Sequence, residues 1–237
     1  MELPPLEPRL EAVLKCIVDE YIRHAEPVGS KWIAETSKLN VSPATIRNDM
    51  AALEDLGYIA QPHTSAGRIP TEQAFLYYLR RFVEPKPAPS AGERFREAVE
   101  EMRGQQDAVK TLAKTLVDLS GEMAIVAVNP RLSYYTGVSN LLQKPEFRDL
   151  AMIQSITELV DRFDDVVGEM FDSVSREPQV LIGRENPFGE NMSAIMVKIR
   201  LPSGHTGIIG LIGPVRMDYE RNLGLMEQAK DVLDDEV

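Results

Sequence analysis

The sequence holds few of the residues that build covalent or metal-bound frameworks. Its 237 residues include one cysteine, Cys16, and three histidines, which stand at positions 24, 63 and 205. A lone cysteine cannot form a disulfide within the chain, and the histidines lack the spacing of zinc ligands. These scarcities exclude a disulfide scaffold and a cysteine-histidine metal site, and we expect no cofactor.

Long apolar runs are also missing. No run approaches the ~18 residues that a membrane span needs. The first residues, Met-Glu-Leu-Pro-Pro-Leu-Glu, are acidic and contain no hydrophobic signal core. We therefore expect a cytoplasmic protein that makes no contact with membranes.

Catalytic signatures are scarce as well. The chain carries no phosphate loop, no Gly-x-Ser-x-Gly elbow and no His-Glu-x-x-His pair. An enzyme is therefore not expected. A ligand-sensing role stays open, because polar residues near the expected ends of strands and helices can line a pocket, namely Asn186, Arg216, Asp218 and Tyr219.

Positive charge is in short supply. The net charge is −11 and the isoelectric point is about 4.9, which excludes bulk electrostatic attraction to nucleic acid. Residues 22–81 are nearly neutral, with seven Lys and Arg against six Asp and Glu. A nucleic-acid function would therefore depend on shape and base contacts more than on charge.

The most informative stretch is residues 42–57. Ser42 followed by Pro43 is typical of a helix N-cap with proline at the first helical position, and Gly57 is typical of the residue that ends a helix. Three apolar residues share one side of this helix at i, i+4 and i+7, namely Ile46, Met50 and Leu53. The pattern predicts a helix that buries one side.

The opposite side of this helix is unusual for a solvated surface. It carries Ala44, Asn48 and Ala51, flanked by Thr45 and Arg47. Small residues allow close approach, Asn can pair with adenine, and Arg can bind guanine or a phosphate. We interpret this side as one that enters a groove of DNA.

The flanking segments support this interpretation. Residues 29–35 predict a short helix and 38–41 a turn, which together with the helix at 43–56 form a helix-turn-helix. Residues 58–63 predict a strand, 64–67 a turn and 68–70 a return strand, which form a wing. The wing offers His63, Thr64, Ser65 and Arg68 to a phosphate backbone or minor groove. The alternative is a plain helical hairpin followed by a β-turn.

Further helices surround this motif. Apolar spacing predicts helices at 9–24 and at 72–84, the latter burying Phe75, Leu76, Leu79 and Phe82. Residues 85–92 contain three prolines and predict a linker. A helix at 93–119 follows, interrupted by Gly104 and three polar residues. Its stripe fits either a dimerising coiled coil or a helix packed on its own domain.

The remaining half mixes strands and helices. We expect a strand at 123–128, a helix at 147–171, a closing helix at 217–233 and three further strands, at 179–182, 194–201 and 206–212. The turn at 202–205 joins the last two strands into an antiparallel hairpin. The expected fold is α+β.

Several strings resemble the family of the heat-inducible transcription repressor HrcA. In the first half they are EPVGSK (26–31), VSPATIRNDM (41–50) and QPHTSAGRIPT (61–71). In the second half they are YTGVSNLL (135–142), PEF (145–147), LIG (181–183), ENP (185–187), IGLIGP (209–214) and RMDY (216–219). The resemblance implies a winged helix-turn-helix domain at 1–84, the linker at 85–92, and a GAF-like effector and dimerisation domain at 93–237.

The resemblance also implies a function. A repressor of this family binds an inverted-repeat operator upstream of chaperonin and chaperone genes, leaves it on heat stress, and is restored by the chaperonin GroEL. In this interpretation Ala44, Thr45, Arg47 and Asn48 face bases, Lys31 and Ser42 contact phosphates, and Arg68 reaches the minor groove. The wing residues His63, Thr64 and Ser65 complete the interface.

One departure from the family concerns the dimer. Typical members carry a dimerisation domain inserted into the GAF-like domain, whereas here only residues 129–133 separate the strand at 123–128 from Tyr134. Reading an inverted repeat requires two copies at a fixed spacing, so we expect a homodimer formed in another way, with the helix at 93–119 as the candidate interface.

Two other functions remain compatible with the sequence. The first is a winged-helix repressor that senses a metabolite through its second half. The second is a protein-interaction module without DNA binding, which the near-neutral charge of residues 22–81 favours.

Overall fold

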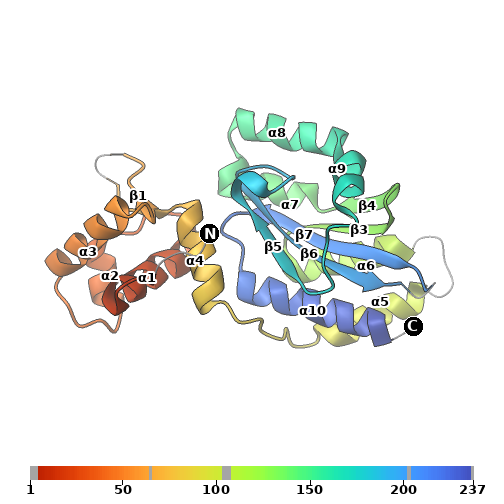
Figure 1. Ribbon diagram of the computed structural model, residues 1–237, viewed down its shortest axis with the longest axis horizontal. Helices are drawn as coiled ribbons and strands as arrows, with labels where there is room; N and C mark the ends of the chain where they lie inside the picture. The colour runs from red at the N-terminus through yellow and green to blue at the C-terminus, as the bar shows by residue number, and fades with distance from the viewer. Residues whose placement is uncertain (1–4, 64–65, 103–107, 202–203, 236–237) are drawn as a thin grey trace. The chain divides into compact units, whose positions relative to one another are not determined.

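The computed structural model describes the chain except residues 1–4, 64–65, 103–107, 202–203 and 236–237. Its contacts divide the chain into two compact units, Met1–Val83 and Glu84–Val237 (Figure 1). Each unit has its own core and is described by itself. Among the described residues, no helix is both long enough and apolar enough to cross a membrane.

The first unit is a helical bundle with a small hairpin. Its elements are α1 (Pro8–His24), α2 (Ser30–Thr36), α3 (Pro43–Asp55), β1 (Ile59–Ala60), β2 (Ile69–Pro70) and α4 (Glu72–Phe82). The first helix, the helix-turn-helix and the return strand are confirmed. Apolar residues of α1, α2 and α3 form the centre of the core, including Leu14, Ile17, Ile33, Ile46 and Leu53.

The buried side of α4 differs from the sequence prediction. The helix buries Ala74, Phe75, Tyr77 and Tyr78, while Leu76 and Leu79 are only half-buried. The hydroxyl of Tyr77 donates to Glu11 at 3.0 Å and that of Tyr78 to Asp19 at 2.6 Å, both on α1. Burial of the two rings therefore leaves their hydroxyls hydrogen-bonded, and burial raises the pKa of Tyr77.

The base of the wing is tied to the segment before α2. The backbone of Arg68 exchanges two hydrogen bonds with that of Val28, at 2.8 and 2.9 Å. At the neighbouring Gly67, an added Cβ would lie 2.4 Å from the Val28 carbonyl oxygen. Only glycine allows the two backbones to approach this closely.

The second unit is built on a five-stranded antiparallel sheet. Its strands are β3 (Met123–Asn129), β4 (Leu132–Thr136), β5 (Gln179–Ile182), β6 (Met192–Arg200) and β7 (Thr206–Pro214), in the order β4-β3-β7-β6-β5. The four predicted strands are confirmed, and β4 was not predicted. Two of the four residues of the predicted turn at 202–205 lie outside the described residues.

Helices cover both faces of this sheet. One face packs against α6 (Ala108–Ser120) and α10 (Tyr219–Asp235), and α5 (Ala91–Met102) packs against these two helices. Figure 1 shows α5 and α10 below the sheet. The other face packs against α7 (Val138–Gln143), α8 (Leu150–Asp161) and α9 (Phe163–Met170), with 3₁₀ turns at Pro145–Phe147 and Gly183–Glu185. The helix predicted at 147–171 therefore breaks in two at Arg162. The α+β class is confirmed.

The apolar core between the sheet and α7–α9 is continuous. Alternate residues of β3, Met123, Ile125 and Ala127, face this core together with Phe147, Phe163 and Phe188. Side chains fill this face of the sheet.

The helix predicted at 93–119 is wrong as a single element. The structure has two helices, α5 and α6, which pack against each other. The ion pair of Arg94 with Asp118, at 3.3 Å, joins the start of α5 to the end of α6. In one straight helix these residues would lie about 36 Å apart. Phe95 and Leu112, among the stripe residues, are fully buried within the unit. A coiled-coil dimer along this segment is therefore overturned.

The proline-rich segment predicted as a linker lies against α10. The amide of Lys86 donates to the Glu220 carbonyl at 2.9 Å, and that of Ala88 to the Gln228 side chain at 2.8 Å. An added Cβ at Gly224 would meet the Lys86 carbonyl at 1.9 Å. The segment therefore belongs to the second unit, and α5 begins at Ala91.

A group of charged side chains lies where β3 begins. The Glu122 side chain is 5% exposed and pairs with Lys144 at 2.9 Å, while Arg216 pairs with Glu146. The second carboxylate oxygen of Glu122, Oε2, has no hydrogen-bond partner among the described residues. Burial raises the pKa of Glu122, and Lys144 opposes this rise.

We predict that Gly67→Ala lowers the thermal midpoint of the first unit, because the added methyl group meets the Val28 backbone. The matched control is Gly29→Ala, where nothing lies within 4 Å of the added atom. Calorimetry of the full chain should show a loss of about 5 °C or more only for Gly67→Ala. Equal midpoints for the two variants would contradict the close approach.

We predict a specific pH dependence for Glu122. Its folded-state pKa is raised, so its contribution to stability is present below the ordinary glutamate pKa of 4.5 and is lost as pH rises through the folded-state pKa. Relative to Glu122→Gln, the wild-type free energy of unfolding should therefore decline from pH 4.5 upward. Denaturant titrations at several pH values measure this difference. A difference that grew with pH would show that Lys144 dominates.

Candidate nucleic-acid interface

The candidate interface is centred on α3, whose two ends are closed by the residues that the sequence indicated. Ser42 Oγ accepts a hydrogen bond from the Thr45 amide at 3.1 Å. At the other end, the Gly57 amide donates to the backbone carbonyl of Glu54 and the Tyr58 amide to that of Leu53, both at 2.9 Å. Gly57 has a φ of +79°, which this Schellman ending requires.

The outward side of α3 has the predicted composition. Ala44, Arg47, Asn48 and Ala51 are exposed and Thr45 is half-buried, while Ile46, Met50 and Leu53 are buried. One guanidinium and one amide therefore stand on a face of small side chains. The guanidinium and the amide can each form several hydrogen bonds to one partner, and the small neighbouring side chains allow that partner to approach closely.

Two hydroxyls at the start of α3 are bonded to each other. Ser42 Oγ and Thr45 Oγ1 lie 3.0 Å apart, and either can be the donor. Only one of the two hydroxyl protons is therefore free for an outside acceptor. Lys31, on the neighbouring α2, is 82% exposed and lies 3.8 Å from Glu35, so its ammonium group is available to solvent.

An ion pair that the sequence did not predict, with a buried carboxylate and a half-exposed guanidinium, anchors α3 to α1. Arg9 donates from Nε to Asp49 Oδ2 at 2.8 Å and from Nη2 to Oδ1 at 2.9 Å. The Asp49 side chain is 5% exposed, and this pairing raises the pKa of Arg9. The available signal was a carboxylate within the apolar stripe, beside Met50.

The residues predicted to contact DNA from the wing lie in different environments. His63 is exposed. Arg68 is held by Glu54 of α3, with its Nε at 3.0 Å and its Nη2 at 2.8 Å from Oε2. Thr64 and Ser65 lie outside the described residues. Sequence reasoning missed Glu54 because nothing local relates positions 54 and 68.

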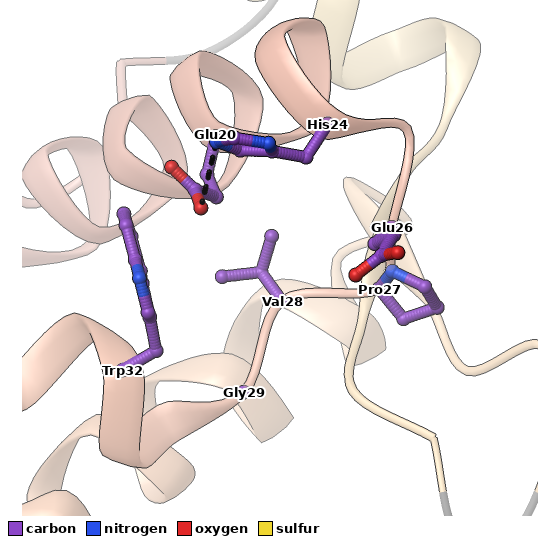
Figure 2. Close-up of a pocket in the computed structure, with 7 residues that line it drawn as sticks. All are labelled: Glu20, His24, Glu26, Pro27, Val28, Gly29 and Trp32. Carbon is purple, nitrogen blue, oxygen red and sulfur yellow. Dashed lines mark ion pairs between the residues drawn. The ribbon is translucent and has the colours of Figure 1, made fainter.

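A surface pocket of about 280 Å³ lies elsewhere in the first unit, between the end of α1 and α2. Figure 2 shows the Val28 side chain pointing into the space between Trp32 and the Glu20–His24 pair. Glu26 lines the same pocket. The carboxylates of Glu20 and Glu26 repel a phosphate, so this pocket is not part of the candidate nucleic-acid interface.

In the part of the chain that the structure describes, no group of three or more His, Cys, Asp or Glu side chains could hold a metal ion. The polar residues proposed for a pocket have internal partners instead. Asn186 donates to two backbone carbonyls, Arg216 pairs with Glu146, and Tyr219 bonds to Ser193 at 3.1 Å. Burial raises the pKa of Tyr219.

The chain matches two family models that together cover most of its length. Residues 6–80 match the winged helix-turn-helix transcription repressor, HrcA DNA-binding, and residues 72–223 match the HrcA protein C terminal domain. The first match contains the candidate interface, and the second spans most of the five-stranded unit.

Individual relatives agree. The heat-inducible transcription repressor HrcA of Halalkalibacterium halodurans is 28% identical over 93% of this chain and 94% of its own length. That alignment covers 328 residues, so the relative carries internal residues that this shorter chain lacks. The HrcA of a Nocardioides species is 36% identical over 75% of this chain and 53% of its own length.

A solved structure has the same fold. It is described as a hypothetical protein at 2.2 Å resolution, aligns with a TM-score of 0.81 at 23% identity, and covers 98% of both chains. The relatives are named as transcription repressors rather than enzymes. With family models matching both of its units, the chain belongs to the HrcA family.

Proposed function

We propose that this protein is a heat-inducible transcription repressor that binds an inverted-repeat DNA operator as a homodimer. The observation that carries the proposal is the bare side of α3, whose small residues surround Arg47 and Asn48, within the segment that matches the repressor DNA-binding model. As a regulator of transcription it would act in the cytoplasm, where bacterial DNA is found.

Base recognition falls to α3. Asn48 has the geometry to donate to and accept from adenine, and Arg47 to donate twice to guanine. Ala44 and Thr45 bring apolar and hydroxyl groups to the same groove, and neither side chain is long enough to keep the helix out. The near-neutral charge of residues 22–81 makes these contacts, rather than phosphate attraction, the main source of affinity.

Backbone contacts fall to the periphery. Lys31 supplies an exposed ammonium group, and the hydroxyl proton left free by the Ser42–Thr45 pair can be donated to a phosphate oxygen. On the wing, His63 is exposed, and Thr64 and Ser65 follow it in the sequence. These residues fix the position of α3 in the groove without reading bases.

A homodimer follows from the operator. An inverted repeat presents two half-sites about one helical turn apart, and each first unit can occupy one. Phe95, Val99, Leu112 and Leu116 of the apolar stripe of α5 and α6 are buried inside the second unit, which favours an interface elsewhere. Two chains per operator would also allow a weak dimer in solution, because the DNA itself brings the copies together.

Release on heating requires limited stability. Burying a polar atom without a partner costs about 1–3 kcal/mol. The second unit has such atoms: Glu122 Oε2 and both amide atoms of Asn222 find no hydrogen-bond partner among the described residues. These groups favour a repressor that unfolds under heat stress. The chaperonin GroEL would then return it to the active fold once it is free of other clients.

We predict that Asn48→Ala and Arg47→Ala each weaken binding to the operator by about 1–3 kcal/mol while binding to a scrambled duplex is nearly unchanged. Fluorescence anisotropy with both duplexes measures the difference. The control is Arg23→Ala, an exposed arginine of α1 outside the interface, which should leave the preference intact. Equal losses on both duplexes would mean that Arg47 touches only phosphate.

We predict that Asn222→Leu raises both the unfolding midpoint and the temperature at which the operator is released. A gain of about 1 kcal/mol corresponds to about 2–4 °C for a unit of this size. The control is Asn191→Leu at an exposed position, which should shift neither. If the midpoint rose while the release temperature stayed unchanged, unfolding would not be the cause of release.

A further inference from the structure

We propose that Arg68 is a positioning residue, which clamps the wing to α3 through Glu54 and does not itself enter the DNA groove. The inference rests on the proposed DNA-binding function and assigns a role to Glu54, which that function did not use. It replaces the sequence expectation that Arg68 reaches the minor groove.

The backbone of Arg68 is fixed before its side chain is considered. Its amide donates to the Val28 carbonyl at 2.9 Å and its carbonyl accepts from the Val28 amide at 2.8 Å. The close approach at Gly67 holds the neighbouring residue against the same backbone. This residue is therefore bound to the segment that leads into α2.

The side chain makes the second attachment. Nε of Arg68 donates to Glu54 Oε2 at 3.0 Å, and Nη2 of the same ion pair lies 2.8 Å from that oxygen. Glu54 lies in the last turn of α3. The Arg68 side chain is only 21% exposed, against 34% for Glu54. One arginine therefore joins three parts of the first unit: the wing, the entry to α2 and the recognition helix.

The pair also determines the charge that α3 presents. If Arg68 swung away to a phosphate, it would leave the Glu54 carboxylate unpaired beside an approaching polyanion. The repulsion would oppose the contact that Arg68 gains. Kept together, the two charges cancel and hold the wing at a fixed angle to α3. The direct contacts of the wing are then left to His63 and the residues after it.

The test uses four full-length variants. Glu54→Gln and Arg68→Gln each break the pair with little change of shape, and the double variant E54R/R68E restores it with reversed charges. The control is Asp55→Asn, which removes a negative charge from an exposed neighbour on the same helix. Operator affinity is measured by anisotropy over a salt series, and amide exchange at Val28 and Arg68 reports the wing attachment.

Removing a negative charge near DNA ordinarily strengthens binding, so a loss for Glu54→Gln identifies the clamp. We expect Glu54→Gln and Arg68→Gln each to weaken operator binding at least about fivefold with an unchanged salt slope. Asp55→Asn should not weaken operator binding. The double variant E54R/R68E should recover operator binding to within about threefold of wild type. A salt slope that falls by about one for Arg68→Gln, with unchanged or tighter binding for Glu54→Gln, would overturn the proposal.

Amide exchange separates this inference from the proposed function. If wild type does not distinguish operator from scrambled duplex, the DNA-binding function fails, whatever the clamp does. The clamp then stands if Glu54→Gln speeds exchange at Val28 and Arg68 at least about fivefold relative to Asp55→Asn. It is overturned if exchange at these two amides is unchanged.

Discussion

The interface of the first unit depends on how α3 is held against α1. Ile46 and Leu53 have no exposed surface, and Arg9 grips Asp49 with two hydrogen bonds of 2.8 and 2.9 Å. Because each residue turns a helix by about 100°, fixing this side also fixes which residues face outward. A rotation by one residue in one direction would turn Asn48 inward, and in the other direction it would bring Asp49, a carboxylate, to the surface. The ion pair therefore stabilises the orientation in which Arg47 and Asn48 are exposed.

Local patterns predicted elements in both units. The cap at Ser42, the ending at Gly57 and the strand at 179–182 are confirmed, because each is encoded within a few neighbouring residues. Partners distant in sequence were not predictable. Arg9 lies 40 residues before Asp49, and no spacing rule connects them. The arginine of the wing was interpreted as a DNA contact because its partner Glu54 is visible only in three dimensions.

Periodicity also left one ambiguity that only the fold resolves. A stripe of apolar residues at spacings of three and four fits one long helix and a pair of antiparallel helices equally well. The described residues form the pair α5 and α6, and Phe95 and Leu112 are buried within the second unit. In α4, Tyr77 and Tyr78 are buried because Glu11 and Asp19 accept their hydroxyl protons. Hydropathy ranks leucine above tyrosine and cannot include such partners.

In the proposed repressor the first unit presents Arg47 and Asn48 to DNA. Both units contain buried polar atoms that find no hydrogen-bond partner among the described residues, including the Tyr58 hydroxyl in the first and the Asn222 amide in the second, and these atoms limit the stability of the chain. The most direct test of operator recognition is the fluorescence anisotropy of a labelled inverted-repeat operator beside a scrambled duplex. A repressor of this kind should prefer the operator by a factor of about 10³ or more, with two chains per duplex. Equal affinity for both duplexes, or no binding to either, would contradict this prediction.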